Sequence, residues 1–310
     1  MSIDQDLSER AMHALDDGGD DRTPAQPSRA RAPLSAGQRV RLVLAHVTIY
    51  LAAALFMLPL VYAFFSALKP NGEMFAMPPR LIGSEVRWSN FVDVFKFGPF
   101  WTYIGNSLFI AVAGTLVVLT VSACAGYAFG RLRWKGRDVV FIAFLATLMV
   151  PAEVLVIPMF QVMQWFDWVD TYQALIFPFA FGAFGTFLMR QFFRGIPLEM
   201  EEAARVDGAG PIRTFLLIML PLSKSALAVL SVFTFLSFWN SYLWPLIVTV
   251  DYKAHGTLPV GLATFSGLTG TRWDLQMAAA IISMVPTTLL VIVLQKHLVK
   301  GIAMAGLGGR

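Results

Sequence analysis

The sequence predicts an all-α membrane protein with six transmembrane helices. Of its 310 residues, 56% are hydrophobic and only 14% are charged, whereas a soluble domain is about 45–50% apolar and about 25% charged. The charged residues also leave six long gaps, and a helix needs only ~20 mostly apolar residues to cross the hydrocarbon core. The net charge of +4 is too small to indicate nucleic acid as a partner. The single cysteine excludes a disulfide scaffold.

The first three spans are expected in residues 41–69, 104–129 and 138–167. The first gap holds the uncharged run VLAHVTIYLAAALFMLPLVYAFFSA, and the second is uncharged and mostly apolar over 104–129. The third gap is interrupted only by Glu153. Proline inside a span, such as Pro59 or Pro158, is compatible with this prediction because neighbouring helices can satisfy the freed backbone groups.

The last three spans are expected in residues 170–190, 224–251 and 274–296. Each is uncharged between its bounding residues. With six spans both termini lie on one side, which then carries 17 basic residues against 6 on the other. Basic residues favour the cytoplasmic side, so the termini are predicted to be cytoplasmic. Residues 67–100 and 250–273 then face outward.

The chain divides into three expected regions. Residues 1–40 begin with an acidic, polar stretch and continue as a Pro/Ala/Arg-rich segment, which predicts a disordered cytoplasmic tail beside the anionic inner leaflet. Residues 41–300 form the transmembrane domain, including a cytoplasmic loop at 195–222. Residues 301–310 form a glycine-rich cytoplasmic tail.

The loop at 195–222 has the local chemistry of two short helices. Pro197 suits the first position of a helix, where its missing N–H costs nothing. Carboxylates follow in the first turns, where the helix dipole favours them: Glu199, Glu201 and Glu202. Gly208 can adopt the left-handed conformation that ends such a helix.

The spacing also gives the first helix an apolar face and starts a second helix. Met200, Ala203 and Ala204 share one face at i, i+3 and i+4. Pro211 begins the second helix, and Pro221 interrupts it just before the fifth span. These features fit equally well a helical hairpin that lies on the membrane without a partner.

The loop resembles the EAA loop of ABC-transporter membrane subunits. The glycine stands four residues after the last alanine, and an isoleucine stands ten residues after the glycine, before a Leu-Pro pair. Asp207-Gly208-Ala209 is similar to the binding-protein-dependent importer subclass. The residues that carry the resemblance are Glu202, Ala203, Ala204, Asp207, Gly208, Ile218, Leu220 and Pro221.

The resemblance implies the type I ABC importer membrane-subunit fold and a coupling role for the loop. It implies that the first helix docks on a separate ATP-hydrolysing subunit, with small Ala203 and Ala204 allowing close approach. Glu202 and Asp207 would face basic groups on the ATPase or cap the loop locally, and both roles stay open. Ile218 and Leu220 would seat the second helix against the bundle.

Further matches resemble the carbohydrate-uptake branch, and the chain's end is similar to the maltose-transporter G-type subunit. They are Lys69-Pro70, Asn90-Phe91, Asn106-Ser107, Phe238-Trp239-Asn240, Trp244-Pro245-Leu246 and Gln295-Lys296. The implied partners are a second permease subunit, two ATP-binding subunits and an extracytoplasmic solute-binding protein in a bacterial or archaeal inner membrane. ATP and Mg²⁺ would be held by the ATPase, and this chain would need no cofactor of its own.

Two groups of residues are candidates for the substrate path. Glu153 is a carboxylate within the third span, and such residues usually face the bundle interior or a water-filled path. Trp239, Asn240, Tyr242 and Trp244 combine aromatic faces with polar groups, which suits sugar rings. The alternatives are an interfacial position for Glu153 and an aromatic belt for the tryptophans.

The sequence offers no catalytic or metal site. It has no phosphate-binding G-x-x-x-x-G-K-[ST] loop, and its four histidines and one cysteine have no metal-ligand spacing. Together with this absence, the resemblance implies a non-enzymatic permease subunit for sugars or oligosaccharides. The alternatives are the same machinery importing a phosphorylated solute such as a glycerol phosphate, or a secondary transporter, which would be expected to show inverted repeats.

Overall fold

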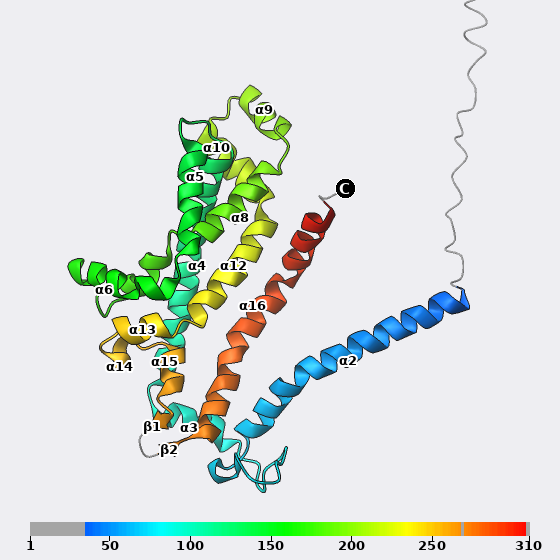
Figure 1. Ribbon diagram of the computed structural model, residues 1–310, viewed down its shortest axis with the longest axis vertical. Coiled ribbons are helices and arrows are strands. Elements are labelled where there is room, and N and C mark those ends of the chain that lie inside the picture. Colours follow the sequence, from blue (N-terminus) through cyan, green and yellow to red (C-terminus); the bar gives the residue numbers. More distant parts are fainter. Residues whose placement is uncertain (1–34, 268–269, 308–310) are drawn as a thin grey trace, which may run out of the picture. The chain divides into compact units, whose positions relative to one another are not determined.

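The computed structural model describes residues 35–267 and 270–307 and is almost entirely helical (Figure 1). The chain divides into two units, Met1–Leu58 and Pro59–Arg310. The expected disorder of residues 1–40 falls mostly outside the described residues, but the first helix already begins at Ala36. At the other end, the last helix continues to Leu307, so most of the expected glycine-rich tail is helical.

The elements follow one another with short connections. The helices are α2 (Ala36–Ala67), α3 (Ser89–Phe97), α4 (Phe100–Gly130), α5 (Arg137–Ala146), α6 (Val156–Trp165), α7 (Tyr172–Ile176), α8 (Ala183–Arg194), α9 (Glu199–Val206), α10 (Pro211–Thr214), α11 (Leu220–Leu222), α12 (Lys224–Trp239), α13 (Leu243–Val248), α14 (Tyr252–His255), α15 (Leu258–Ala263) and α16 (Trp273–Leu307). Between them lie 3₁₀ turns η1 (Asn71–Glu73), η2 (Thr147–Met149), η3 (Ala152–Leu155) and η4 (Phe177–Phe179), and the π-helix η5 (Phe215–Met219). Strands β1 (Ser266–Gly267) and β2 (Gly270–Thr271) pair antiparallel.

Three of the six predicted spans are continuous helices, and three are bent. By length and composition α2, α4 and α16 can each cross a membrane. The other three are helix pairs bent by more than 40°, and six spans result if each bent pair counts as one. The third span bends by 93° between Met149 and Ala152, where Pro151 directly precedes η3. Residues that precede proline avoid the helical conformation, which explains the break.

The fifth span differs from the prediction at both ends. It pairs 211–222 with 224–239 at an angle of 75°, so the last 12 residues of the predicted cytoplasmic loop belong to it. Helix α12 ends at Trp239, and residues 243–248 form the separate helix α13. The expected range of 224–251 is therefore wrong, because uncharged residues continue past the end of the helix.

Helix α4 packs against both α8 and α12 in the second unit (Figure 1). Its close contact with α8 depends on Gly126, where an added Cβ would lie 2.5 Å from Met189 Cβ and 2.9 Å from the Arg190 backbone nitrogen. Small residues at helix contacts let backbones approach closely, which is how helices associate inside lipid. Nearby, Tyr127, Met189, Phe193 and Met219 belong to one buried cluster.

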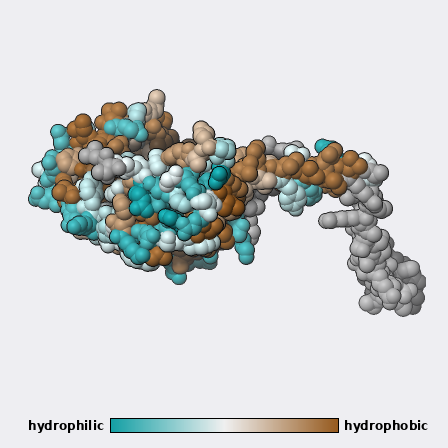
Figure 2. All heavy atoms as spheres, turned by 90° about the horizontal axis from the view of Figure 1, so that it is seen from below, coloured by the Kyte–Doolittle hydropathy of each residue, from teal (hydrophilic) through white to brown (hydrophobic). Residues whose placement is uncertain are grey.

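Two buried amides hold the loops at the opposite end. Asn106 Nδ2 donates to the carbonyls of Ala254 (2.8 Å) and Gly256 (2.9 Å). Asn90 Nδ2 donates to the carbonyls of Ala67 (2.9 Å) and Lys69 (3.0 Å). A buried donor left unpaired is costly, so each asparagine fixes its loop. Figure 2 views this end, where α3 and the hairpin lie, and shows hydrophilic residues gathered on its central face.

Candidate functional site

Helix α9 is the first of the two short helices predicted in the loop. It begins at Glu199, with Leu198 as its cap, so Pro197 precedes the helix and does not occupy its first position as expected. Glu199, Glu201 and Glu202 lie in its first turns. Carboxylates at this end complement the helix dipole.

The end of α9 is a Schellman motif built on Gly208. This residue has φ of +78°, the left-handed conformation that was predicted. The Gly208 N–H donates to the Arg205 carbonyl (3.0 Å), and the Ala209 N–H donates to the Ala204 carbonyl (2.9 Å). These two bonds satisfy carbonyls that a helix end leaves free. No atom lies within 4 Å of a Cβ at Gly208, so backbone conformation and not space requires glycine.

The two alanines of the motif differ in their exposure to solvent. Ala204 is 5% exposed, whereas Ala203 is exposed to solvent. Met200 is also exposed, so of the three residues predicted to share a face only Ala204 packs against this chain. Glu202 is exposed, so α9 turns an acidic face outward.

An ion pair joins α9 to the end of α4. Arg131 follows the last residue of α4, and its Nε lies 3.2 Å from Glu201 Oε1, with both side chains largely buried. The same Nε donates to the Phe193 carbonyl (2.9 Å), and Nη2 donates to the Ile196 carbonyl. The Nε hydrogen is directed at Phe193, so Glu201 Oε1 is paired by charge and has no hydrogen-bond donor among the described residues.

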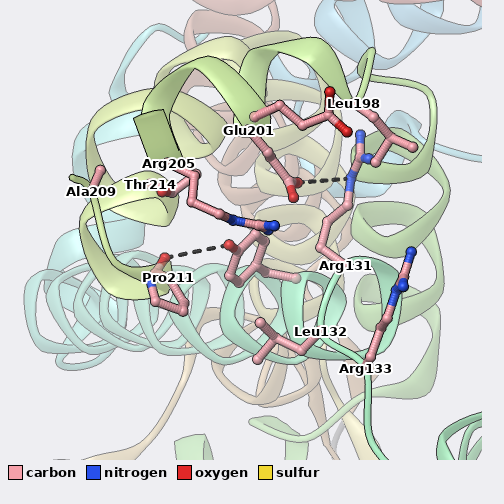
Figure 3. Close-up of a pocket in the computed structure, with 11 residues that line it drawn as sticks. Arg131, Leu132, Arg133, Leu198, Glu201, Arg205, Ala209, Pro211 and Thr214 are labelled. Atoms are coloured by element: carbon pink, nitrogen blue, oxygen red, sulfur yellow. Dashed lines mark hydrogen bonds and ion pairs between the residues drawn. The ribbon is translucent and has the colours of Figure 1, made fainter. Parts of the chain in front are cut away.

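Below α9 the pair borders a cavity of about 340 Å³ (Figure 3). Arg131 and Glu201 meet at one side of it, and Pro211 accepts a hydrogen bond from Tyr127 Oη (3.3 Å). The lining also includes Arg133 and Arg205. The loop is therefore attached to the bundle at both of its helices, and the cavity between them is polar and charged.

The second helix of the loop enters the bundle through a π-helix. Met219 is fully buried in the cluster with Tyr127 and Met189, and Leu220 packs at its margin. Ile218, which was expected to seat the helix, is only half-buried, and Pro221 is exposed. A π-helix adds a residue to the turn, and the residue that reaches the core cannot be read from α-helical spacing.

The predicted path residues fall into two groups. Trp239 and Trp244 are buried in the chain itself, where their indole N–H groups donate to the carbonyls of Ser283 (3.1 Å) and Ala174 (2.9 Å). Asn240 follows the end of α12, and Tyr242 precedes α13; both are exposed. The two tryptophans are therefore packing residues in this conformation.

Glu153 lies in η3, at the bend of the third span, and its side chain is exposed.

The ion pair of Arg131 and Glu201 was not predicted from the sequence. The available signal was a third acidic residue beside the motif and a basic residue directly after an apolar span, but only the fold brings the two together.

Comparisons with known proteins show the family of the chain. Residues 122–304 match the family described as "Binding-protein-dependent transport system inner membrane component". The sn-glycerol-3-phosphate transport system permease protein UgpE of Pectobacterium atrosepticum is 37% identical over 84% of this chain and 95% of its own. The arabinooligosaccharides transport system permease protein AraQ of Halalkalibacterium halodurans is 34% identical over 81% and 91%.

Solved structures show the same fold. A chain of a bacterial ABC transporter involved in the import of the acidic polysaccharide alginate superposes with a TM-score of 0.72 and 24% identity, covering 86% of this chain and 99% of that one. The fold is thus that of a type I ABC importer membrane subunit. By sequence and by fold, the chain belongs to the binding-protein-dependent transport family and is a multi-pass permease subunit of an ABC importer.

Proposed function

We propose that this chain forms half of the translocation path of an ATP-driven importer of sugars or oligosaccharides, and that α9 receives force from a separate ATPase subunit. The observation that carries the proposal is the geometry of α9. Its outer face presents Glu202 and Ala203 to solvent, while its inner face is fixed to α4 by Arg131 and Glu201. A helix that is exposed on one side and fixed on the other can transmit a displacement from a partner subunit to the transmembrane helices.

The partners follow from this role. Glu202 and Asp207 are exposed carboxylates without an ion-pair partner in the described residues, and we assign them to basic groups on the ATPase. A second permease subunit would supply the other half of the path, and two ATPase subunits would hold ATP and Mg²⁺. A solute-binding protein would dock at the end where α3 and the hairpin lie. One structural relative was crystallised with a periplasmic protein carrying an alginate pentasaccharide.

ATP binding would favour the outward-open state of the path, and hydrolysis would restore the inward-open state. The ATPase can shift this equilibrium only if it binds one conformer of the permease more tightly. Glu153, Asn240 and Tyr242, which are exposed, are the proposed path residues among those expected from the sequence.

Two substrate classes follow from the relatives. The match to AraQ supports a sugar, and the match to UgpE supports a glycerol phosphate as the second candidate.

The test of the proposed function is co-purification of the chain with an ATPase subunit whose activity rises when loaded binding protein is added. Transport by this chain alone in liposomes without ATP would overturn the proposal.

A further inference from the structure

A groove opens where the fourth span is broken. It has a volume of about 350 Å³ and is lined by α4, by the η4–α8 junction and by α12. The break at Gly182 lies 12 residues before the end of α8, which is ~18 Å of helix rise. In membrane proteins, irregular backbone at this depth is tolerated where it is buried in protein or lines a water-filled cavity.

Aromatic rings form the walls of the groove. Phe181, Phe184 and Phe233 are 67%, 47% and 57% exposed. Phe184 and Phe233 face each other across α8 and α12 at 6.1 Å between centroids and 80° between planes. Exposed rings that converge from two helices offer flat apolar faces, a lining typical of small-molecule sites.

Three hydroxyl groups lie among these rings without a partner. Thr234, Ser237 and Ser241 line the groove, their side chains make no hydrogen bond within the described part of the chain, and Ser237 is exposed. Ser231 on the same helix is different, because its Oγ donates to the Ala228 carbonyl (2.8 Å). None of the three is among the buried unpaired polar groups of the described residues, so they are open to pair with an incoming ligand or with water.

The lining carries no charge. No Asp, Glu, Lys, Arg or His is among the groove residues. A phosphate would lose its hydration here without meeting a cation, whereas a sugar combines hydroxyls that hydrogen-bond with C–H faces that contact rings.

We propose that this groove is a subsite for a neutral carbohydrate ring, completed by the second permease subunit. The inference deepens the proposed function and rests on it. The uncharged lining of the groove favours a sugar over a glycerol phosphate as the substrate. The competing occupants of the same surface are a lipid acyl chain and a helix of the partner permease, and both are outcomes of the test.

The first experiment measures whether water reaches the groove. Ser237→Cys and Ser231→Cys are placed singly in a Cys124→Ser background and assembled with the other subunits in membranes. The probe is 2-sulfonatoethyl methanethiosulfonate, which is charged and stays in water. We expect at least tenfold faster labelling at position 237 than at position 231. Equal, slow labelling at both would mean that lipid or protein covers the groove, and would overturn the proposal.

The second experiment separates the groove from the coupling machinery. The probes are labelled arabinotriose and labelled sn-glycerol 3-phosphate, each with its loaded binding protein. We expect Ser237→Ala and Phe184→Ala to lower arabinotriose moved per ATP by roughly 3- to 10-fold. Phe184→Tyr, which keeps the ring, should lose less than Phe184→Ala, and Ser231→Ala, which lies outside the groove lining, should match the wild type.

The failures are distinguishable. Uptake of arabinotriose that is unaffected by the groove variants would overturn the subsite and leave the sugar importer standing. Uptake of sn-glycerol 3-phosphate alone would overturn the subsite together with the sugar assignment. A parallel fall in ATPase stimulation and uptake would indicate a structural effect and count against the groove.

Discussion

Arg131 Nε lies 3.2 Å from Glu201 Oε1, and this contact connects the end of α4 to the first turns of α9. Arg131 also donates to the carbonyls of Phe193, in the last turn of α8, and Ile196, just after the end of that helix. One side chain therefore joins two spans and the exposed helix. Movement of α9 should be passed to both spans together, without a hinge between them.

Arg131→Ala should reduce uptake strongly and lower the melting temperature of the purified complex. Removing one member of a buried ion pair leaves an unpaired charge, at a cost of about 3–5 kcal/mol. Glu201→Gln should have a smaller effect, because Arg131 keeps its two carbonyl acceptors. Arg133→Ala is the control, since Arg133 is exposed and borders the same cavity. Equal effects of Arg131→Ala and Arg133→Ala would argue against the special role of the pair.

Gly208→Val should abolish uptake, whereas Gly208→Asn should retain part of it. A side chain at φ of +78° costs about 1–2 kcal/mol per residue, with asparagine tolerated best. The Schellman end would be lost and α9 would point differently. Gly210→Ala is the matched control, because Gly210 has an ordinary φ of −72° and open space around it. ATP-dependent uptake into vesicles measures both, and a normal rate for Gly208→Val would refute the requirement.

Glu202→Lys should abolish transport without changing membrane levels of the protein. Glu202 is exposed and has no ion-pair partner within the described chain, so its replacement leaves the fold intact. The reversed charge would meet basic groups on the ATPase. Blotting of membranes together with an uptake assay separates the two quantities. Import at the normal rate by this variant would show that coupling does not depend on this carboxylate.

Gly126→Ala should destabilise the bundle, and Gly105→Ala should not. The added Cβ at position 126 would clash with Met189 Cβ at 2.5 Å and with backbone beside it. Overpacking of this kind costs typically about 1–3 kcal/mol. Gly105 lies in the same helix with nothing within 4 Å of its added Cβ. Thermal denaturation in detergent compares the two variants, and similar melting temperatures would contradict the packing argument.

The loop after α2 should lose stability in acid. The hydroxyl and N–H of Ser84 donate to the Glu73 carboxylate and hold its pKa below the ordinary value of 4.5. Because the pKa is lowered in the folded loop, the ionised carboxylate stabilises the loop at pH values above the ordinary pKa. This stabilisation is lost as the pH falls through the folded pKa. Ser84→Ala should therefore increase protease cleavage of the loop at pH 7, and the difference from wild type should vanish in strong acid. A difference that persists there would exclude the carboxylate as its cause.

The continuous spans were predictable from the sequence because charge spacing alone determines them. Helix α4 matches the gap that predicted it, α16 covers its gap and continues to Leu307, and Gly208 was identified by local chemistry. The bends were not predictable, because Pro151 breaks its span while Pro59 lies inside the continuous α2. Which outcome a proline has depends on the neighbours that satisfy the freed backbone.

The site was predictable in its motif and not in its contacts. Arg131 and Glu201 stand 70 positions apart in the sequence, and no periodicity relates them. Trp239 and Trp244 have the composition of a sugar site, yet the fold turns them into the interior. The groove residues Phe184 and Ser237 look like ordinary helix residues, and only the missing hydrogen bonds distinguish Ser237 from Ser231.

The π-helix at Phe215–Met219 sets the direction in which α9 projects from the helix bundle. Each α-helical residue turns the chain by ~100°, so the one extra residue of a π-turn rotates everything before it relative to α12. Deleting a single apolar residue there would preserve hydropathy, charge and the EAA residues, yet aim the acidic face of α9 away from its partner. Compatibility between permeases and ATPases of different importers could thus depend on a single inserted residue that lies outside the docking surface itself.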